Sequence, residues 1–578
     1  MAIQDDSPAN IAPANDGNKT SDVPLKGVFR PWMIIIALII IAAYQYHFIN
    51  FTWDDPFITW RYAENFANGK GLVFNDGQRV EGYSNLLYVL IFALLYKVHI
   101  YWGELRLLYP AKIIGSITSL ALILLTVRYA TKLDSFRRLD YPKAAIIIGF
   151  LAASNIFLHI WAMCGMETLL FPTLILWGNL VLIKGLESEM GSRIRSFVVS
   201  GFIFFLVSIT RADGFLMVLV TLMFILVTIY QKKVSFKEGL SFLLTWLVPS
   251  LAVLGWRYSY YGEIFPMSYY SKATGGWEQV LSGFSQWWLG ANHIFGNLAV
   301  YLVMYLPLIT RKGRVGQGYY LIFMQALFYQ LYIIWSGYDW LLGNRFFVHI
   351  LPQLELMLFA GICEAFKLDK DFKPSIINDP TLEKKRTRLI FLIVILAGMA
   401  GFYGNRGFYA YQLASVQSGY KNLVDYAAGK SDNPSPSWMP IEDYEAGIWM
   451  KENAQPTDLL AICDIGAIPY ISEVQVLDCF GLADKYVAKL PGDFFFEKYD
   501  IDYILGDKPG YNERPPDFIL LQGYTWAESN GELRYKPRRK ITDEYMVVLW
   551  DDDRFHQRYE LIYSKYFFLI YKLKNTNT

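Results

Sequence analysis

Long apolar runs alternate with short polar connectors over most of the chain that precedes the C-terminal region. A membrane-spanning helix needs about 20 consecutive, mainly apolar residues, and most of these runs approach that length. We therefore predict a polytopic α-helical membrane protein with about eleven transmembrane helices. The predicted spans lie near residues 33–49, 108–128, 143–162, 167–184, 196–211, 214–231, 240–258, 297–310, 319–336, 346–364 and 388–404.

One apolar segment, residues 84–100, is shorter than these runs and carries Lys97 and His99. If it crossed the membrane, the basic connector that begins at Arg128 would lie on the same side as the loop that begins at Asp54. Basic connectors belong on the cytoplasmic side. We therefore predict that this segment is a helix lying at the outer membrane surface.

Beyond the last predicted span the pattern changes to short apolar runs bounded by turn residues. After a Ser/Pro-rich linker it predicts one helix, at residues 441–453, and a set of short strands. Strands mixed with a helix indicate a small α/β or α+β domain. The predicted strands are residues 458–465, 474–479, 518–521, 545–550 and 566–573.

The distribution of Lys and Arg predicts how the chain lies in the membrane. Lys26 and Arg30 precede the first span, and further basic connectors lie within residues 128–143, 184–195, 232–237, 311–314 and 367–388. Placing all of them in the cytoplasm fixes the N-terminus there, and an odd number of spans then puts the C-terminus outside. We expect a multi-pass protein of the inner (plasma) membrane with three parts. These are a disordered cytoplasmic N-terminus (1–30), a transmembrane catalytic domain (31–404, with its first extracytoplasmic loop at 53–107) and an extracytoplasmic domain (405–578).

Composition agrees with this architecture and excludes one class of partner. Of the 578 residues, 54% are hydrophobic and only 18% are charged, and the mean hydropathy is +0.24. A net charge of +1 gives no electrostatic reason to expect a nucleic-acid partner. The four cysteines have no CxxC spacing, so they predict no metal framework. Cys463 and Cys479 are either one disulfide or two free buried thiols.

The loop over residues 53–85 is longer than a simple connector, which usually has about 4–6 residues. It opens with two adjacent carboxylates, Asp54 and Asp55, and also carries Arg61, Glu81 and Tyr83. We interpret it as an active-site loop at the membrane surface. With the predicted topology, further polar residues near span ends fall on the same outer face, where ionisable groups are costly and usually functional. They are Glu167, Arg211, Asp213, Tyr269, Lys272, Asp339, Trp340, Arg345 and His349.

These residue types suit glycosyl transfer from a lipid-phosphate sugar. Cations hold phosphate well, and we predict this role for Arg211, Lys272 and Arg345. A carboxylate can take the proton of the incoming acceptor hydroxyl, and Asp54 and Asp55 are the candidates. The other predicted substrate-binding residues are Arg61, Glu81, Tyr83, Glu167, Tyr269, Asp339, Trp340 and His349.

Each residue also has a structural interpretation. An Asp pair after a span can be a solvated boundary, an arginine can anchor a helix at the interface, and Glu167 can cap the helix that follows it. A lipid-sugar transporter, or a non-catalytic scaffold whose C-terminal domain binds a wall polymer, would use the same architecture. The joint position of the polar residues on one predicted face favours the glycosyltransferase over these alternatives.

Several stretches resemble one family of membrane glycosyltransferases. The stretch DDPFITWRYAENFANGKGLVFNDGQRVEGYSN resembles the first-loop signature of the terminal β-(1→2)-arabinofuranosyltransferase family, within the GT-C superfamily. CGMETLLF, TRADG, YYGEIFPMSYYSK and the region from Gly337 to Phe347 resemble later motifs, although Ala212 replaces a usual proline. Cys463-Asp464-Ile465-Gly466 stands where the family has Gly-Asp-x-Gly, so the resemblance extends into the C-terminal domain.

The resemblance implies a GT-C fold, a polyprenyl-phosphate sugar donor, inverting transfer, and a cell-envelope glycan or lipid-linked acceptor reached from outside. It implies that a first-loop aspartate is the general base, and we favour Asp54, with Asp55 positioning the acceptor or a cation. Arabinofuranose is the family's best-known sugar. Some members of the superfamily need a divalent cation such as Mg²⁺ or Mn²⁺, for which Asp54, Asp55 and Glu167 are the candidate ligands here. We expect the C-terminal domain to help recognise the acceptor through aromatics such as Tyr470, or else to keep those aromatics in its core.

Overall fold

A computed structural model describes most of the chain outside the two terminal regions and the segment between the helical part and the C-terminal domain. The predicted N-terminal region 1–30 and the predicted span 388–404 lie outside the described residues. The described residues are 31–49, 51–101, 103, 105–137, 141–272, 275–295, 299–310, 315–337, 339, 344–365, 441–492, 498–527, 533–537 and 544–574.

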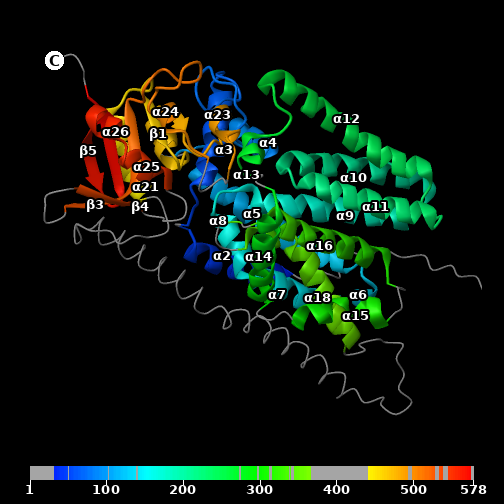
Figure 1. The fold of residues 1–578 in the computed structure, drawn as a ribbon. Helices are drawn as coiled ribbons and strands as arrows, with labels where there is room; N and C mark the ends of the chain where they lie inside the picture. The colour runs from blue at the N-terminus through cyan, green and yellow to red at the C-terminus, as the bar shows by residue number, and fades with distance from the viewer. Residues whose placement is uncertain are drawn as a thin grey trace, which may run out of the picture.

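The described part of the chain before residue 366 is a helical assembly, and each predicted span in it falls on a helix or a helix pair (Figure 1). By length and composition four helices can cross a membrane, or five if one bent pair counts as a single span. The helices on single predicted spans are α2 (Pro31–His47), α5 (Leu108–Ala130), α9 (Leu170–Glu187, preceded by the 3-10 turn η1, Glu167–Leu169), α10 (Met190–Thr210), α11 (Gly214–Tyr230), α12 (Phe236–Tyr261), α15 (Ala299–Thr310) and α16 (Gln317–Ser336).

Two predicted spans are broken in the structure. The span at 143–162 consists of α7 (Tyr141–Ala153) and α8 (Ile156–Met163), which are bent by 52°. Asn155 causes the second helix to start anew, because its side chain accepts the Phe157 N–H at 3.1 Å. The span at 346–364 consists of the short helix α17 (Arg345–Val348) and α18 (Leu351–Ala365). The second break contains the candidate residue His349.

Five further helices in the described residues lie outside the predicted spans, and one of them, α6 (Asp134–Arg137), connects α5 to α7. The predicted surface helix at 84–100 is α4 (Leu86–Lys97), which packs on α3 (Asp55–Ala67) of the first loop. α13 (Met267–Lys272) and α14 (Trp277–Phe295) follow α12, and the apolar-run pattern did not predict α14. It is amphipathic, with Trp277, Leu281 and Trp288 exposed and Ala291 buried against the bundle, so its apolar residues are too dispersed to form a run.

The C-terminal domain is built on a mixed sheet. Parallel strands β2, β1 and β3 form one side, and antiparallel β6 and β5 continue the sheet in the order β2-β1-β3-β6-β5. β4 pairs with the end of β3 away from this path. This confirms an α/β domain. Its strands are β1 (Leu459–Ile462), β2 (Gln475–Asp478), β3 (Phe518–Ala527), β4 (Leu533–Pro537), β5 (Tyr559–Lys565) and β6 (Phe568–Leu573).

The predicted helix at 441–453 is confirmed as α21 (Ile441–Asn453), whereas the predicted strand at 545–550 is wrong. That segment is α25 (Glu544–Trp550), and its buried residues Tyr545, Met546, Leu549 and Trp550 recur at helical spacing. The strands β4 and β5 were not predicted, and β5 is largely exposed, so it lacks a clear apolar alternation. The other helices are α22 (Ala467–Ser472), α23 (Lys485–Ala488), α24 (Ile501–Ile504) and α26 (Asp553–Arg558).

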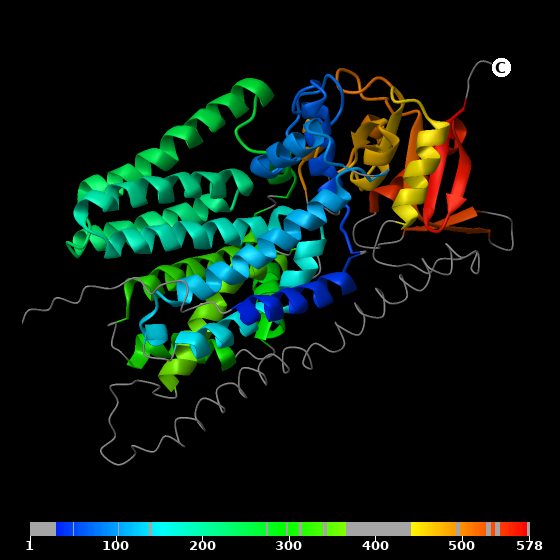
Figure 2. The same cartoon turned by 180° about the vertical axis from the view of Figure 1, so that it is seen from behind.

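The first loop and the C-terminal domain share one hydrophobic core. Phe57 and Trp60 of α3 and Tyr470 of α22 are all buried, with ring centroids 4.6–6.1 Å apart. Figure 2 shows the domain against α3 and α4 at one end of the helical assembly. At the other end, the basic connectors come together: Lys132, Arg193, Lys232 and Lys233 line a single cavity. The two faces predicted from the sequence therefore lie at opposite ends of the helices.

Candidate active site

The two carboxylates of the first loop lie at the start of α3, where the chain enters the shared core. Asp54 precedes the helix, and its carboxylate accepts the N–H of Gly466 at 2.9 Å and that of Ala467 at 2.6 Å. Burial raises the pKa of Asp54 well above its ordinary value, and the nearby charges of Asp443 and Asp464 raise it further. The C-terminal domain therefore forms one wall of the site around Asp54.

Asp55 lies within electrostatic range of a cluster on the helical side. Burial raises the pKa of Asp55, and the positive charges of Lys272 and Arg345 oppose this rise. Arg345 makes a two-pronged ion pair with Asp339, with Nη2 to Oδ1 at 3.0 Å and Nε to Oδ2 at 3.2 Å. Asp464 acts on Asp55 as well as on Asp54. Both aspartates thus face residues from several elements.

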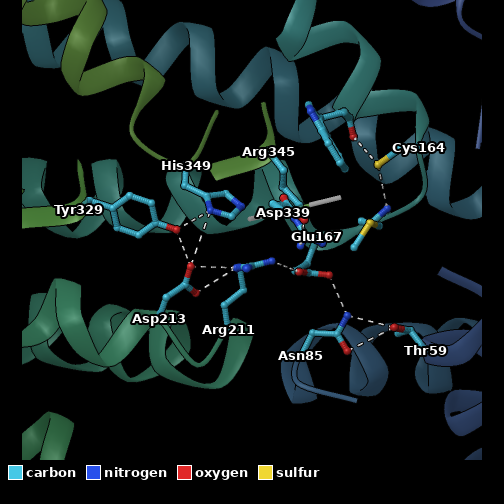
Figure 3. A network of polar contacts seen from close by, with 12 residues as sticks. Thr59, Asn85, Cys164, Glu167, Arg211, Asp213, Tyr329, Asp339, Arg345 and His349 are labelled. Atoms are coloured by element: carbon cyan, nitrogen blue, oxygen red, sulfur yellow. Dashed lines mark hydrogen bonds and ion pairs between the residues drawn. The ribbon is translucent and has the colours of Figure 1, made fainter. Parts of the chain in front are cut away.

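Glu167 connects the first loop to the helical bundle. Its side chain, 2% exposed, accepts from Asn85 Nδ2 at 2.8 Å and pairs with Arg211 Nη1 at 2.7 Å (Figure 3). Asn85 in turn contacts Thr59 of α3 at 3.0–3.3 Å. Gly165, two residues before Glu167, has φ +91°, and an added Cβ would lie 3.1 Å from the Trp60 ring. The tight CGMET turn, which requires glycine at position 165, therefore places Glu167 between Asn85 and Arg211.

The contacts continue from Arg211 into the bundle. Arg211 Nε donates to both oxygens of Asp213, at 3.0 and 3.3 Å. Asp213 also accepts from the Tyr329 hydroxyl of α16, which lies 2.6 Å from His349 Nδ1 (Figure 3). We call Thr59, Asn85, Glu167, Arg211, Asp213, Tyr329 and His349 the polar network. It joins α3, η1, α16 and α17 and the connections beside them through buried charged groups.

The three cations predicted to hold the donor phosphate come together in the structure. Lys272, at the end of α13, interacts electrostatically with both Arg345 and Arg211, as well as with Asp55 and Asp339. Arg211 and Arg345 are each paired with carboxylates, at 12% and 11% side-chain exposure. A phosphate bound by these cations would share their donors with the carboxylates of Glu167, Asp213 and Asp339, and the phosphate-binding role stays a prediction.

Other predicted substrate-binding residues lie in the walls of the loop. Arg61 is buried and donates to three backbone carbonyls, those of Phe74 (2.9 Å), Pro469 (2.7 Å) and Val474 (2.6 Å). Glu81 is fully buried and pairs with Arg257 at 2.8 Å. The Tyr83 hydroxyl lies 3.0 Å from that of Tyr261. These contacts join the loop to its neighbours, and a substrate role for the three residues stays a prediction.

The remaining predicted residues differ in their environment. Tyr269 is 48% exposed on α13 and packs against Phe265, beside the cation cluster. Trp340 lies outside the described residues. Tyr470 is buried in the shared core, so its environment is that of a structural aromatic residue. Cys463 and Cys479 are both buried and free, so the free-thiol alternative holds.

A divalent-cation site at Asp54, Asp55 and Glu167 stays a prediction. Within the described ranges, no three or more His, Cys, Asp or Glu side chains converge as metal ligands. Glu167, a candidate ligand, is occupied by Arg211 and Asn85 instead of joining Asp54 and Asp55. We therefore derive no step through a metal ion.

Sequence reasoning did not assign a role to several residues that the structure brings to the site. Asp464, Asp443, Asn85 and Tyr329 all belong to this group. Asp464 stands in a recognisable motif and Asn85 ends the first-loop signature, so both carried a local signal. Tyr329 lies in the apolar helix α16 and has no such local signal. Its place in the site is visible only from its contacts with Asp213 and His349.

Comparisons with known proteins add one partial family match and several similar folds. A family model described as "Domain of unknown function (DUF8728)" matches residues 438–571, inside the C-terminal region. The search of curated proteins finds no match.

Among solved structures, ArnT from Cupriavidus metallidurans bound to undecaprenyl phosphate is similar, with a TM-score of 0.55 and 12% identity over 93% of this chain and 97% of that chain. The apo state of ArnT gives a TM-score of 0.54 and 11% identity with the same coverage. The apo oligosaccharyltransferase of Archaeoglobus fulgidus gives 0.50 and 13%, over 92% of this chain and 79% of that chain. At 11–13% sequence identity, these likenesses are likenesses of fold. Their coverage includes both the helical part and the C-terminal domain. The chain has the fold of the polytopic GT-C membrane glycosyltransferases.

Proposed function

We propose that the protein is an inverting glycosyltransferase that moves a sugar from a polyprenyl-phosphate donor to a glycan or glycolipid acceptor. The reaction would take place at the outer face of the plasma membrane. The observation that carries the proposal is that Lys272 lies within electrostatic range of Arg211, Arg345 and Asp55, and that Asp55 adjoins Asp54 at the start of α3. An anion site next to a base is what transfer from a lipid phosphate requires.

In this mechanism the donor phosphate lies against the three cations, and its polyprenyl tail lies along the helices. The acceptor hydroxyl oxygen attacks the anomeric carbon from the face opposite the phosphate. As the new C–O bond forms, the bond between the anomeric carbon and the phosphate oxygen breaks. Asp54 takes the hydroxyl proton, and polyprenyl phosphate leaves with its charge balanced by the cations. A single displacement inverts the anomeric configuration.

The environments of the two aspartates support this division of roles. Burial and the charges of Asp443 and Asp464 raise the pKa of Asp54, so its carboxylate binds a proton more tightly than a free aspartate does. Asp55 interacts with Lys272 and Arg345, so it would orient the cations around the phosphate. Neither role requires a group from outside the described residues.

The identity of the sugar and of the acceptor is proposed from the sequence resemblance. The first-loop resemblance makes arabinofuranose the first donor sugar to test, within a panel of other polyprenyl-phosphate sugars. The acceptor would be a cell-envelope glycan or a lipid-linked glycan. The position of the C-terminal domain beside Asp54 supports its contact with that acceptor.

The test uses the purified full-length protein in lipid nanodiscs with radiolabelled polyprenyl-phosphate sugars and a membrane-glycan extract. We expect transfer from one donor, with inversion, and a loss of about 100- to 10,000-fold in the Asp54→Asn variant. Asp551→Asn, which removes an exposed carboxylate far from the site, serves as the matched control. Saturable donor binding or lipid movement across vesicles, without transfer from any donor, would replace the enzyme with a transporter.

A further inference from the structure

The contact between Asp54 and the C-terminal domain is made by backbone groups. The first peptide N–H groups of the α22 region, those of Gly466 and Ala467, each donate to one oxygen of the Asp54 carboxylate. The partners are 412 and 413 residues apart in the chain. Two donors on two oxygens fix both the position and the rotation of the carboxylate plane.

The fit at this contact leaves no room for a side chain on Gly466. A Cβ added there would lie 2.2 Å from the Asp54 carbonyl oxygen and 2.3 Å from its carboxylate carbon. These separations are far below any van der Waals contact, and the atoms that would have to move belong to Asp54 itself. Glycine at this position is therefore required by the close approach of the two segments.

Further contacts hold the same two segments together beyond Asp54. Arg61 donates to the carbonyls of Pro469, within α22, and of Val474, just beyond that helix. Asn75 exchanges two hydrogen bonds with Val476, donating to its carbonyl at 2.7 Å and accepting its N–H at 2.9 Å. The shared apolar core lies beneath these contacts. Docking of the domain is thus specified at several separate points.

We propose that the C-terminal domain, which includes the domain of unknown function, positions the catalytic carboxylate of Asp54 through the backbone amides of Gly466 and Ala467. This inference rests on the proposed glycosyltransferase function. It assigns Gly466 and Ala467 as positioning residues and makes docking of the domain a condition for transfer. The domain would act on the reaction itself, in addition to any contact with the acceptor.

One experiment tests the contact without measuring activity. Hydrogen–deuterium exchange of the full-length protein in nanodiscs should show slow exchange for the amides of the peptide around residues 464–470. The Asp54→Ala variant, which removes the acceptor oxygens, should exchange these amides faster while peptides of the core strand β3 stay unchanged. Equal exchange in both proteins would overturn the proposal. This outcome does not depend on finding the right sugar donor.

A second experiment measures the effect on transfer. Gly466→Ala should lower kcat by about 100-fold, because a displacement of about 1 Å is enough for such a loss, while the KM for the donor stays nearly constant. The control is Gly255→Ala, which adds a Cβ in open space on α12. An unchanged kcat in Gly466→Ala would reject the positioning role. If the wild-type protein transfers no sugar at all, the proposed function fails, and the exchange experiment still decides whether the amides hold Asp54.

Discussion

At the scale of single residues, the site consists of charged side chains that are paired with one another before any ligand binds. Arg345 illustrates this, because its guanidinium is aligned on Asp339 by two hydrogen bonds and lies in the same cluster as Lys272 and Asp55. Such pre-organised cations would meet a phosphate without first having to be ordered. The sequence predicted these residues individually, and the structure shows that they form one cluster.

Arg345→Lys tests this pre-organisation. The lysine keeps the charge but loses the planar pair of donors, so one charged hydrogen bond is lost, worth about 1.5–3 kcal/mol. We expect the KM for the polyprenyl-phosphate donor to rise by about 10- to 100-fold, with a smaller change in kcat. Initial-rate measurements over a range of donor concentrations give the result. Arg514→Lys, in an exposed Arg–Asp pair, is the matched control and should have no effect. An unchanged donor KM would remove Arg345 from the donor site.

At the scale of elements, the first loop is held between α12 and the C-terminal domain. Glu81 pairs with Arg257 near the C-terminal end of α12, and Tyr83 and Tyr261 join the same two elements. The loop therefore cannot move without breaking buried polar contacts, which are expensive to leave unpaired. Local sequence pattern does not reveal that Glu81 pairs with Arg257, because the two residues are 176 positions apart. From the sequence alone, Glu81 was therefore predicted only as a substrate-binding residue.

The Glu81–Arg257 pair predicts a pH dependence of stability. Burial raises the pKa of Glu81 from 4.5 to about 7, although Arg257 opposes the rise. Because the folded state binds this proton more tightly than the unfolded state, the contribution of Glu81 to stability is greatest below pH 4.5 and declines as pH rises to about 7.

Glu81→Gln, which cannot ionise, should flatten this part of the profile. Thermal unfolding of the detergent-solubilised protein, followed between these pH values for both proteins, provides the measurement. Glu560→Gln removes an exposed carboxylate on β5 and should keep the wild-type slope. A Glu81→Gln profile that parallels the wild-type one would contradict the assignment.

At the scale of the whole molecule, the chemistry and the basic connectors lie at opposite ends of the helices. Asp54 contacts the C-terminal domain, whereas Lys132, Arg193 and Lys233 line one cavity. Figure 1 shows α3 and α13 beside the C-terminal domain and α6 at the far end of the helices. The C-terminal domain shares a core with the first loop, so it is part of the same folded unit.

Cysteine labelling tests the predicted orientation of this unit. Tyr511→Cys places a thiol on the exposed surface of the C-terminal domain, and Lys233→Cys places one at the basic end. The four native cysteines are buried and give a low background. With a membrane-impermeant maleimide on intact cells, the first variant should label at once and the second only after permeabilisation. The reverse pattern would place the active site in the cytoplasm.

The sequence by itself determined where the helices on the predicted spans lie in the described part of the chain, the surface helix at 84–100 and the helix at 441–453. It also determined the local motifs that carry Asp54, Glu167, Arg211 and Arg345. These features depend on local properties, namely the length of apolar runs, their period and the residues at their ends. Local pattern failed where a short apolar run fits both a strand and a helix. The segment 545–550 was predicted as a strand and is the helix α25.

Only the tertiary structure decided which of these motifs meet. The bonds from Gly466 and Ala467 to Asp54, the three carbonyls around Arg61 and the path from Glu167 to His349 join segments far apart in the chain. A buried polar group must find a partner, but the partner is set by how the elements pack and not by its distance in the sequence. Several residues of the candidate site were therefore visible in the sequence, while their arrangement depends on how the C-terminal domain packs on the first loop.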